Sequence, residues 1–288
     1  MPDKIQPKVL VAIVLVLFAW SSAFTAIRAV GPHFDPGALA LARQTVAVPL
    51  LALFMIGTKW VKPTAREWVL LTIFGLTWFS MYIVALNTAE QTLDAGTASF
   101  IVNIGPLLIA IGAGLFLGEG LPPKLVTGAL VALGGVGVIA WATAQSDHLD
   151  IVGVGWALLA MLGYTIGVLT QKPTLRRLPS AQVTLIGATI AWFPLAFWAP
   201  TAVSNLAVAP AEAWWGVIWL GAIPTALGFG LWGYALKRMP AGRLGVTTYL
   251  VPPLVIIESA ILLGEYPHPL AIVGGALALG GVALARRA

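Results

Sequence analysis

The chain carries little charge and no cysteine. Only 9% of its 288 residues are Asp, Glu, Lys or Arg, against roughly 25% in soluble proteins, whereas 59% are hydrophobic. So few charges cannot cover the surface of a soluble fold of this length. The lack of cysteine excludes disulfides, zinc–thiolate sites, iron–sulfur clusters and cysteine nucleophiles. Together with 31 glycines, these absences indicate a polytopic helical membrane protein.

Several motifs of other membrane proteins are also missing. The sequence has no phosphate-binding loop, so nothing supports ATP-driven transport. It has no histidine pair at helical spacing, so neither a metal site nor any cofactor is expected. It also lacks clustered Lys or Arg within its apolar stretches, which disfavours transport of phosphate esters.

Apolar windows of the length that crosses a bilayer, about 20 residues, fill the chain. Gly, Pro, Ser and Asp mark the joints between them. The sequence therefore predicts ten transmembrane helices and no extramembrane domain. The predicted windows are 9–30, 37–57, 68–88, 95–117, 123–143, 151–171, 182–200, 213–235, 242–263 and 269–286.

The positive charges fall on one side of this arrangement. Of the 16 Lys and Arg residues, 14 lie at the two termini or in the loops after even-numbered windows. By the positive-inside rule, both termini are expected in the cytoplasm. This distribution also accounts for the net charge of +5 without a nucleic-acid partner.

The chain repeats itself at an offset of 146 residues. Of the 31 positions in 106–136, 13 are identical to their counterparts in 252–282, including the blocks Leu-Gly-Glu and Ala-Leu-Gly-Gly-Val. The predicted units are 1–146 and 147–288, each with five spans, together forming one membrane domain. Because five is odd, the two units are expected to cross the membrane in opposite senses. Such inverted repeats are typical of transporters with a substrate site near the midplane.

These features resemble the drug/metabolite transporter superfamily, ten-helix EamA type. The resemblance spans the whole chain and rests on Pro106 and Pro252, on the repeated Leu-Gly-Glu, and on a first-span pattern at residues 18–24. The aromatic interior is most similar to YddG-like amino-acid exporters. The resemblance implies export of small metabolites through a cavity lined mainly by helices 1, 3, 4, 6, 8 and 9. It also implies that helices 5 and 10 are peripheral and that the protein lies in a prokaryotic inner membrane.

Aromatic and uncharged polar side chains at helical spacing are the candidate cavity lining. Rings can bind an ammonium group or an aromatic side chain, and hydroxyl and amide groups can bind a carboxylate. The alternative interpretation is ordinary packing with interhelical hydrogen bonds. The predicted substrate-binding residues are Trp20, Ser21, Phe24, Trp78, Tyr82, Ser99, Asn103, Tyr164, Thr165, Trp232 and Tyr249.

Two charged residues lie within predicted spans, where charge is costly. Arg43 could bind a substrate carboxylate, or could reach outward to pair with Asp35 and anchor its helix. Glu258, expected some four turns into the ninth span, is the candidate proton-coupling residue. It could equally be a protonated interior acid or have a stabilising partner.

Hinge or gating roles are predicted for residues of the fourth and ninth spans. Pro106, Pro252 and Pro253 each remove a backbone hydrogen bond and could act as hinges or produce static kinks. Glu119 and Glu265 end the two spans, and their repetition favours a symmetric structural or gating role.

The leading hypothesis is a secondary transporter that exports small organic metabolites by alternating access. Amino acids with aromatic or neutral side chains are the expected substrates. The alternatives are a multidrug or organic-cation exporter of the same fold, a channel, and a membrane-embedded enzyme that would use Glu90 and Asp94. Those two acids fit a hydrated loop better, so no catalytic residues are predicted. The expected partners are the substrate and the lipid bilayer, with the protein acting as a monomer, although a dimer stays open.

Overall fold

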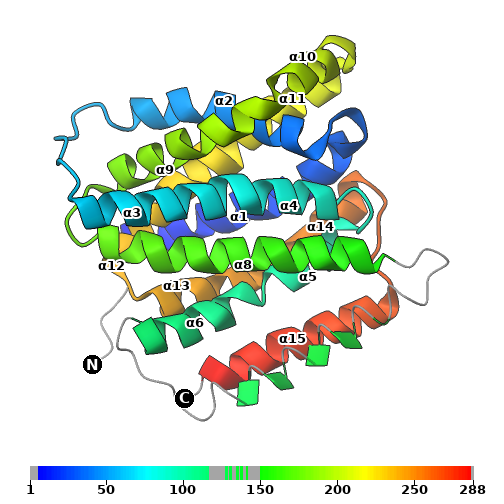
Figure 1. Ribbon diagram of the computed structural model, residues 1–288. Coiled ribbons are helices and arrows are strands. Elements are labelled where there is room, and N and C mark those ends of the chain that lie inside the picture. Colours follow the sequence, from blue (N-terminus) through cyan, green and yellow to red (C-terminus); the bar gives the residue numbers. More distant parts are fainter. Residues whose placement is uncertain are drawn as a thin grey trace.

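The computed structural model describes residues 6–116, 127–128, 130–131, 134–135, 137–138, 141 and 150–286. This part of the chain is almost entirely helical and contains no strand. The helices pack side by side in a bundle (Figure 1). The predicted all-α polytopic fold is confirmed.

Seven helical segments in the described part of the chain are long and apolar enough to cross a membrane. They match seven predicted windows and comprise α1 (Pro7–Val30), α2 (Pro36–Leu53), α3–η2–α4 (Ala65–Phe74, Gly75–Met81, Tyr82–Ala89), α5–α6 (Ala95–Val102, Gly105–Phe116), α8 (Ile151–Thr174), α9–η3–α10 (Ser180–Leu195, Ala196–Trp198, Ala199–Val208) and α11–η4–α12 (Ala211–Leu220, Gly221–Gly228, Phe229–Arg238).

The last two predicted windows contain shorter helices. They are α13 (Ala241–Thr247), the 3₁₀ turn η5 (Thr248–Leu250), α14 (Val251–Leu262) and α15 (Pro269–Arg286). The window 123–143 falls largely outside the described residues, so the count of ten spans stays a prediction. Below, the two ends of the bundle are called the Glu67 end and the Glu90 end, because these residues mark the start and finish of α3–η2–α4.

Aspartates set the beginning of several helices. The Asp35 carboxylate accepts hydrogen bonds from the backbone N–H groups of Gly37 and Ala38 at the start of α2. Asp94 and Asp150 cap α5 and α8 in the same way. These side chains satisfy donors that have no partner within the helix. The Asp35 carboxylate therefore caps its own helix and does not pair with Arg43.

The 146-residue repeat reappears in the secondary structure. At this offset α3 coincides with α11, α6 coincides with α14, and α5 begins where α13 begins. The elements η2 and η4 are both π-helical and start at equivalent glycines, Gly75 and Gly221. π-Helical turns are rare and frequently occur at functional sites.

Helices of the two repeats interleave. α5 packs against α14, and α6 packs against α13, so the first half of one segment meets the second half of the other. The segments α5–α6 and α13–η5–α14 therefore run antiparallel. In addition, α1 packs against α11, α12 and α14, whereas α8 packs against α3, α4 and α6. This arrangement supports an inverted repeat.

Pro106, Pro252 and Pro253 lie at interruptions of these two segments rather than inside continuous helices. Pro106 is the second residue of α6, after a break at Asn103–Ile104. Pro252 and Pro253 lie in the first turn of α14, immediately after η5. A first-turn proline costs little, because the N–H that it lacks would have no helical partner. The helix is therefore broken before each proline, and the hinge role stays a prediction.

Gly75 and Gly221 bring the π-helices close to neighbouring backbone. A Cβ atom at Gly75 would lie 2.5 Å from the carbonyl oxygen of Gly187 in α9. At Gly221 it would lie 2.6 Å from the carbonyl oxygen of Arg43 in α2. Only glycine fits at these two contacts, which are equivalent in the repeat.

Substituting Gly75→Ala is expected to lower the free energy of unfolding by about 1–3 kcal/mol, because backbone atoms must move apart. The measurement is thermal unfolding of the purified protein in detergent. Gly155→Ala is the matched control, since nothing lies within 4 Å of its added Cβ atom. It is expected to be neutral or slightly stabilising. Equal effects of the two substitutions would contradict the close contact.

α15 lies at the edge of the bundle (Figure 1) and packs against α5 and α6. Gly135 approaches it so closely that an added Cβ atom would lie 2.5 Å from the carbonyl oxygen of Gly274. This matches the expected peripheral position of the tenth span and its glycine-mediated packing.

Candidate substrate site

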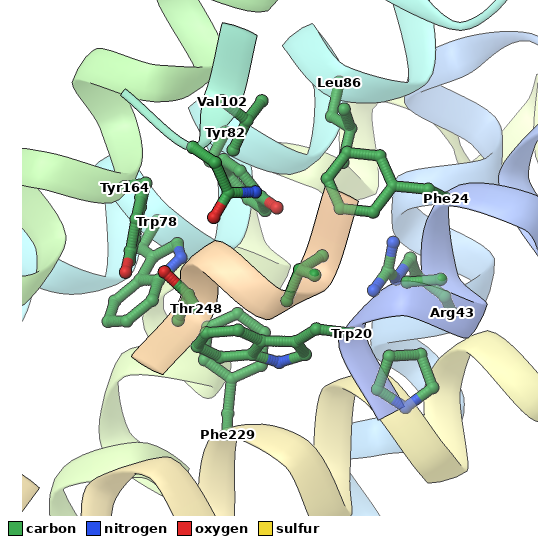
Figure 2. Close-up of a pocket in the computed structure, with 14 residues that line it drawn as sticks. Trp20, Phe24, Arg43, Trp78, Tyr82, Leu86, Val102, Tyr164, Phe229 and Thr248 are labelled. Carbon is green, nitrogen blue, oxygen red and sulfur yellow. The ribbon is translucent and has the colours of Figure 1, made fainter. Parts of the chain in front are cut away.

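A cavity lies at the centre of the bundle, where the two repeats meet (Figure 2). The volume accessible to the centre of a water molecule is only about 30 Å³, so the cavity has room for little more than solvent. Its lining consists of Trp20, Ala23, Phe24, Arg43, Trp78, Tyr82, Leu86, Val102, Asn103, Tyr164, Pro224, Phe229, Thr248 and Val251.

Aromatic rings form one wall of this cavity. The Trp78 ring centroid lies 4.9 Å from that of Phe229, 5.2 Å from that of Tyr164 and 6.0 Å from that of Trp20. These separations are typical of favourable aromatic pairs. The indole N–H of Trp20 is buried and has no acceptor among the described residues, and it lies next to Gly228 at the end of η4.

Six of the eleven predicted substrate-binding residues line the cavity: Trp20, Phe24, Trp78, Tyr82, Asn103 and Tyr164. Trp232 is fully buried behind the wall, with its ring 4.8 Å from that of Trp20. Tyr249 is half-buried outside the cavity lining, although its counterpart Asn103 is part of it.

The other three predicted residues use their hydroxyl groups elsewhere. Ser21 donates to Glu258 Oε1 at 2.7 Å, Ser99 to the carbonyl of Gly96 at 2.7 Å, and Thr165 to the carbonyl of Met161 at 2.9 Å. Helical spacing predicted that these residues line the cavity. Their hydroxyl groups bond to other partners instead, and they are not among the lining residues. They contribute to packing and helix contacts in this structure.

The sequence-based prediction missed several lining residues, which the repeat could have identified. At the 146-residue offset Trp78 corresponds to Pro224, and Val102 corresponds to Thr248. Both members of each pair line the cavity. Phe229 follows the π-helix η4 directly and carries no comparable signal in the sequence.

Arg43 brings a positive charge to the side of the cavity opposite Tyr164 and Trp78 (Figure 2). Its side chain is buried, and its Nε and Nη2 atoms donate to Thr225 Oγ1 at 3.1 and 2.8 Å. Thr225 in turn donates to the carbonyl of Leu220 at 2.6 Å, which fixes it within η4. Among the described residues Arg43 forms no salt bridge, so the alternative of an Arg43–Asp35 pair is wrong.

Glu258 lies beside the cavity rather than in it. It is in the second turn of α14, not four turns into a continuous helix, because η5 interrupts that span. Its half-buried carboxylate accepts the Ser21 hydrogen bond at the base of a lateral groove of about 640 Å³. The groove lies between α1, α11 and α14, and Trp215 and Trp219 line it with Glu212. Its role in coupling stays a prediction.

An ion pair joins two elements at the Glu90 end. Arg28 in the last turn of α1 donates to Glu265 Oε1 at 2.7 Å and to the carbonyl of Glu90 at 3.0 Å. Gln91 also accepts from it through its carbonyl, at 3.2 Å. These groups border an outer vestibule of about 350 Å³, which is lined by Arg28, Gly31, Pro32, Phe34, Glu90 and Gln91. The repeat counterpart of Glu265, Glu119, lies outside the described residues.

The Glu90 side chain is buried, so the expectation that it lies in a hydrated loop is wrong. It is 1% exposed, and neither carboxylate oxygen has a hydrogen-bond partner among the described residues. Asp94 instead caps α5 and accepts from Thr97 Oγ1 at 2.6 Å. The different use of the two acids gives no support to a catalytic pair.

Polar contacts also join elements at the Glu67 end. Glu67 pairs with Arg177, whose Nε atom donates to Glu67 Oε1 at 2.9 Å. Lys172 donates to the carbonyls of Leu236 and Met239 at 2.6 and 2.8 Å. Polar contacts therefore join elements at both ends of the bundle.

No group of three or more His, Cys, Asp or Glu suited to a metal ion occurs in the described part of the chain. The site consists of aromatic rings, one guanidinium and a few uncharged polar groups.

Comparisons with known proteins agree with this architecture. Residues 7–141 and 151–287 each match the EamA-like transporter family. The chain is 36% identical over 283 residues to a probable terminal-alkyne amino-acid exporter of Streptantibioticus cattleyicolor, covering 96% of this chain and 92% of that protein. It is 26% identical over 282 residues to a probable amino-acid metabolite efflux pump of Salmonella typhimurium, covering 93% and 91%.

A solved crystal structure shares the fold, with a TM-score of 0.68, 21% sequence identity, and coverage of 98% of this chain and 99% of that one. The two family matches correspond to the repeated elements α3–α6 and α11–α14. The chain therefore belongs to the EamA-like transporter family of the drug/metabolite transporter superfamily, and it is a multi-pass membrane transporter rather than an enzyme.

Proposed function

We propose that the protein exports amino acids with neutral or aromatic side chains, which bind in the central cavity. The observation that carries this proposal is the buried guanidinium of Arg43, which has no carboxylate partner among the described residues and faces a wall of aromatic rings. A buried charge needs a counterion. The names of the two relatives above, an amino-acid exporter and an amino-acid metabolite efflux pump, support the same substrate class.

The cavity offers a separate place for each part of an amino acid. Arg43 binds the carboxylate, because guanidinium groups form strong charge-assisted hydrogen bonds with it. The aromatic wall around Trp78 binds an apolar side chain. The ring faces of Trp20 and Tyr82 and the amide of Asn103 bind the ammonium group.

Transport by alternating access needs two units that move against each other around this site. The proposed units are 1–146 and 147–288, related by inversion, with the breaks before Pro106 and Pro252 as hinges. Opening at the Glu90 end requires separation of Arg28 from Glu265, and opening at the Glu67 end requires separation of Arg177 from Glu67. The closed cavity corresponds to an intermediate between the two open states. The positive-inside rule places the Glu67 end in the cytoplasm of a cell with the transporter in its inner membrane.

A multidrug or organic-cation exporter is the second candidate, and the cavity lining argues against it. No Asp or Glu is among the residues that line the central cavity, whereas Arg43 is. A cationic substrate would therefore meet an unfavourable charge.

Counterflow in proteoliposomes tests the function. Vesicles loaded with unlabelled phenylalanine or leucine are expected to accumulate the labelled amino acid from outside. The amines that lack the carboxylate are expected to give no accumulation. Exchange of amines, or of a lipophilic cation, at an equal rate would favour the organic-cation alternative. A channel would equilibrate the label without transient accumulation, and an enzyme would change it chemically.

A further inference from the structure

Glu90 is a buried acid to which the proposed transport cycle gives no role. It directly follows the apolar segment Ala65–Ala89, and its carboxylate has neither solvent contact nor a hydrogen-bond donor among the described residues. One turn earlier on the same helix, Leu86 lines the central cavity. Arg28, whose guanidinium contacts the Glu90 carbonyl, borders the outer vestibule. Glu90 thus lines the vestibule and lies one turn from a residue that lines the substrate cavity.

Such a position disfavours an ionised carboxylate, whose stability then depends on nearby positive charge. An ionised carboxylate that is removed from water and lacks hydrogen bonds is strongly destabilised. Burial therefore raises the pKa of Glu90 well above its ordinary value. Arg28 and Arg43 oppose this effect, whereas Asp94 and Glu265 add to it. The remaining titratable group whose charge interacts with that of Glu90 is Tyr82.

The two arginines differ in their availability. Arg28 is already paired with Glu265, whereas Arg43 has only the uncharged Thr225 as a partner among the described residues. Arg43 is therefore the positive charge that an incoming carboxylate can neutralise. Arg43 lines the same cavity as Leu86, which is one turn before Glu90, so its neutralisation leaves less positive potential to stabilise an ionised Glu90.

We propose that Glu90 is a proton-binding site linked to the substrate site, so that a substrate carboxylate bound at Arg43 causes Glu90 to take up a proton. This inference rests on the proposed function, because it requires a carboxylate at Arg43. By linkage, the protonated protein must bind the amino acid more tightly. Affinity is highest at low pH and falls as the pH rises between the values at which Glu90 titrates in the bound and in the free protein. The expected change is about 5- to 150-fold, the usual range for coupled sites.

Calorimetry of amino-acid binding in detergent tests the linkage. Titrations with phenylalanine or leucine across a series of pH values, each in buffers of different ionisation enthalpy, give the number of protons taken up and the pH range in which uptake occurs. The wild-type protein is expected to take up a fraction of one proton per bound amino acid. Glu90→Gln is expected to take up none, and its dissociation constant should no longer depend on pH. Measurable binding by this variant shows that it is folded.

Two further acids provide controls. Glu212→Gln changes an exposed residue in the first turn of α11 and is expected to keep the wild-type proton uptake. Glu258→Gln tests the other candidate acid and is also expected to keep it. Glu90→Asp retains a titratable group and is expected to restore uptake, with a shifted pH midpoint.

The outcomes separate this inference from the proposed function. Amino-acid binding by the wild-type protein without proton uptake would overturn the inference and leave the proposed function intact. Uptake that survives Glu90→Gln, or disappears in Glu258→Gln, would also overturn it. A failure of the wild-type protein to bind or exchange any amino acid would instead reject the proposed function.

Discussion

Replacing Arg43 by glutamine is expected to weaken binding of a free amino acid about 10- to 150-fold, because a charge-assisted hydrogen bond contributes about 1.5–3 kcal/mol. Binding of the corresponding amino-acid amide, which has no carboxylate, should change much less. The measurement is competition by each compound against labelled substrate in counterflow or direct binding. The ratio between acid and amide isolates the carboxylate contact from a general loss of packing.

Two control substitutions define the role of the guanidinium. Arg43→Lys keeps the charge and loses the planar fork, so an intermediate affinity is expected. Thr225→Val removes the acceptor of both Arg43 hydrogen bonds and keeps the charge, so its effect should be smaller than that of Arg43→Gln. An equal loss of affinity for acid and amide in Arg43→Gln would show that Arg43 only supports the structure.

Replacing Trp78 by alanine is expected to lower the free energy of unfolding by about 3–5 kcal/mol, as do other large-to-small changes in cores. The ring is 1% exposed and contacts the rings of Trp20, Phe74, Tyr164, Phe229 and Trp232. Thermal unfolding of the purified protein in detergent measures the loss. The space left by the indole should also admit substrates with larger side chains, which counterflow competition can detect.

Trp215→Ala is the matched control, because this side chain is 71% exposed on the outer surface of α11. Its removal should leave thermal stability nearly unchanged, as surface substitutions usually do. If Trp78→Ala were no more destabilising than Trp215→Ala, the ring cluster would not be a packed core.

The sequence predicted the site best from residues of a type that is unusual at their depth in the membrane. Trp20 and Trp78 lie too far from the span ends for an interfacial role, and both line the cavity. The repeat predicted related elements in the two halves, and α6 and α14 begin and end at equivalent positions. The uneven distribution of Lys and Arg predicts how the protein is oriented in the membrane, and this orientation stays a prediction.

The sequence predicted the site poorly where the direction of a side chain or the packing of a loop determines what a residue contacts. Ser21 and Ser99 have the expected helical spacing, yet each hydroxyl is used in another contact. Glu90 stands next to Gln91 and near Asp94, a polar context typical of a hydrated loop. It is nevertheless buried, and Arg28 of α1 contacts its carbonyl, a long-range contact that no local pattern encodes.

The interleaving of the repeats has a consequence for how the chain is made. α1 finds its packing surfaces on α11, α12 and α14, which leave the ribosome long after α1 has entered the membrane. At the usual rate of about 5–20 residues per second, synthesis of the second repeat takes about 7–28 s. During this interval Ser21 and Ser22 of α1 lack their hydrogen-bond partners from the second repeat, Glu258 and Trp219. The early helices must therefore remain in the bilayer without these partners or be shielded by the insertion machinery. The first repeat cannot reach its final packing before the second repeat is inserted.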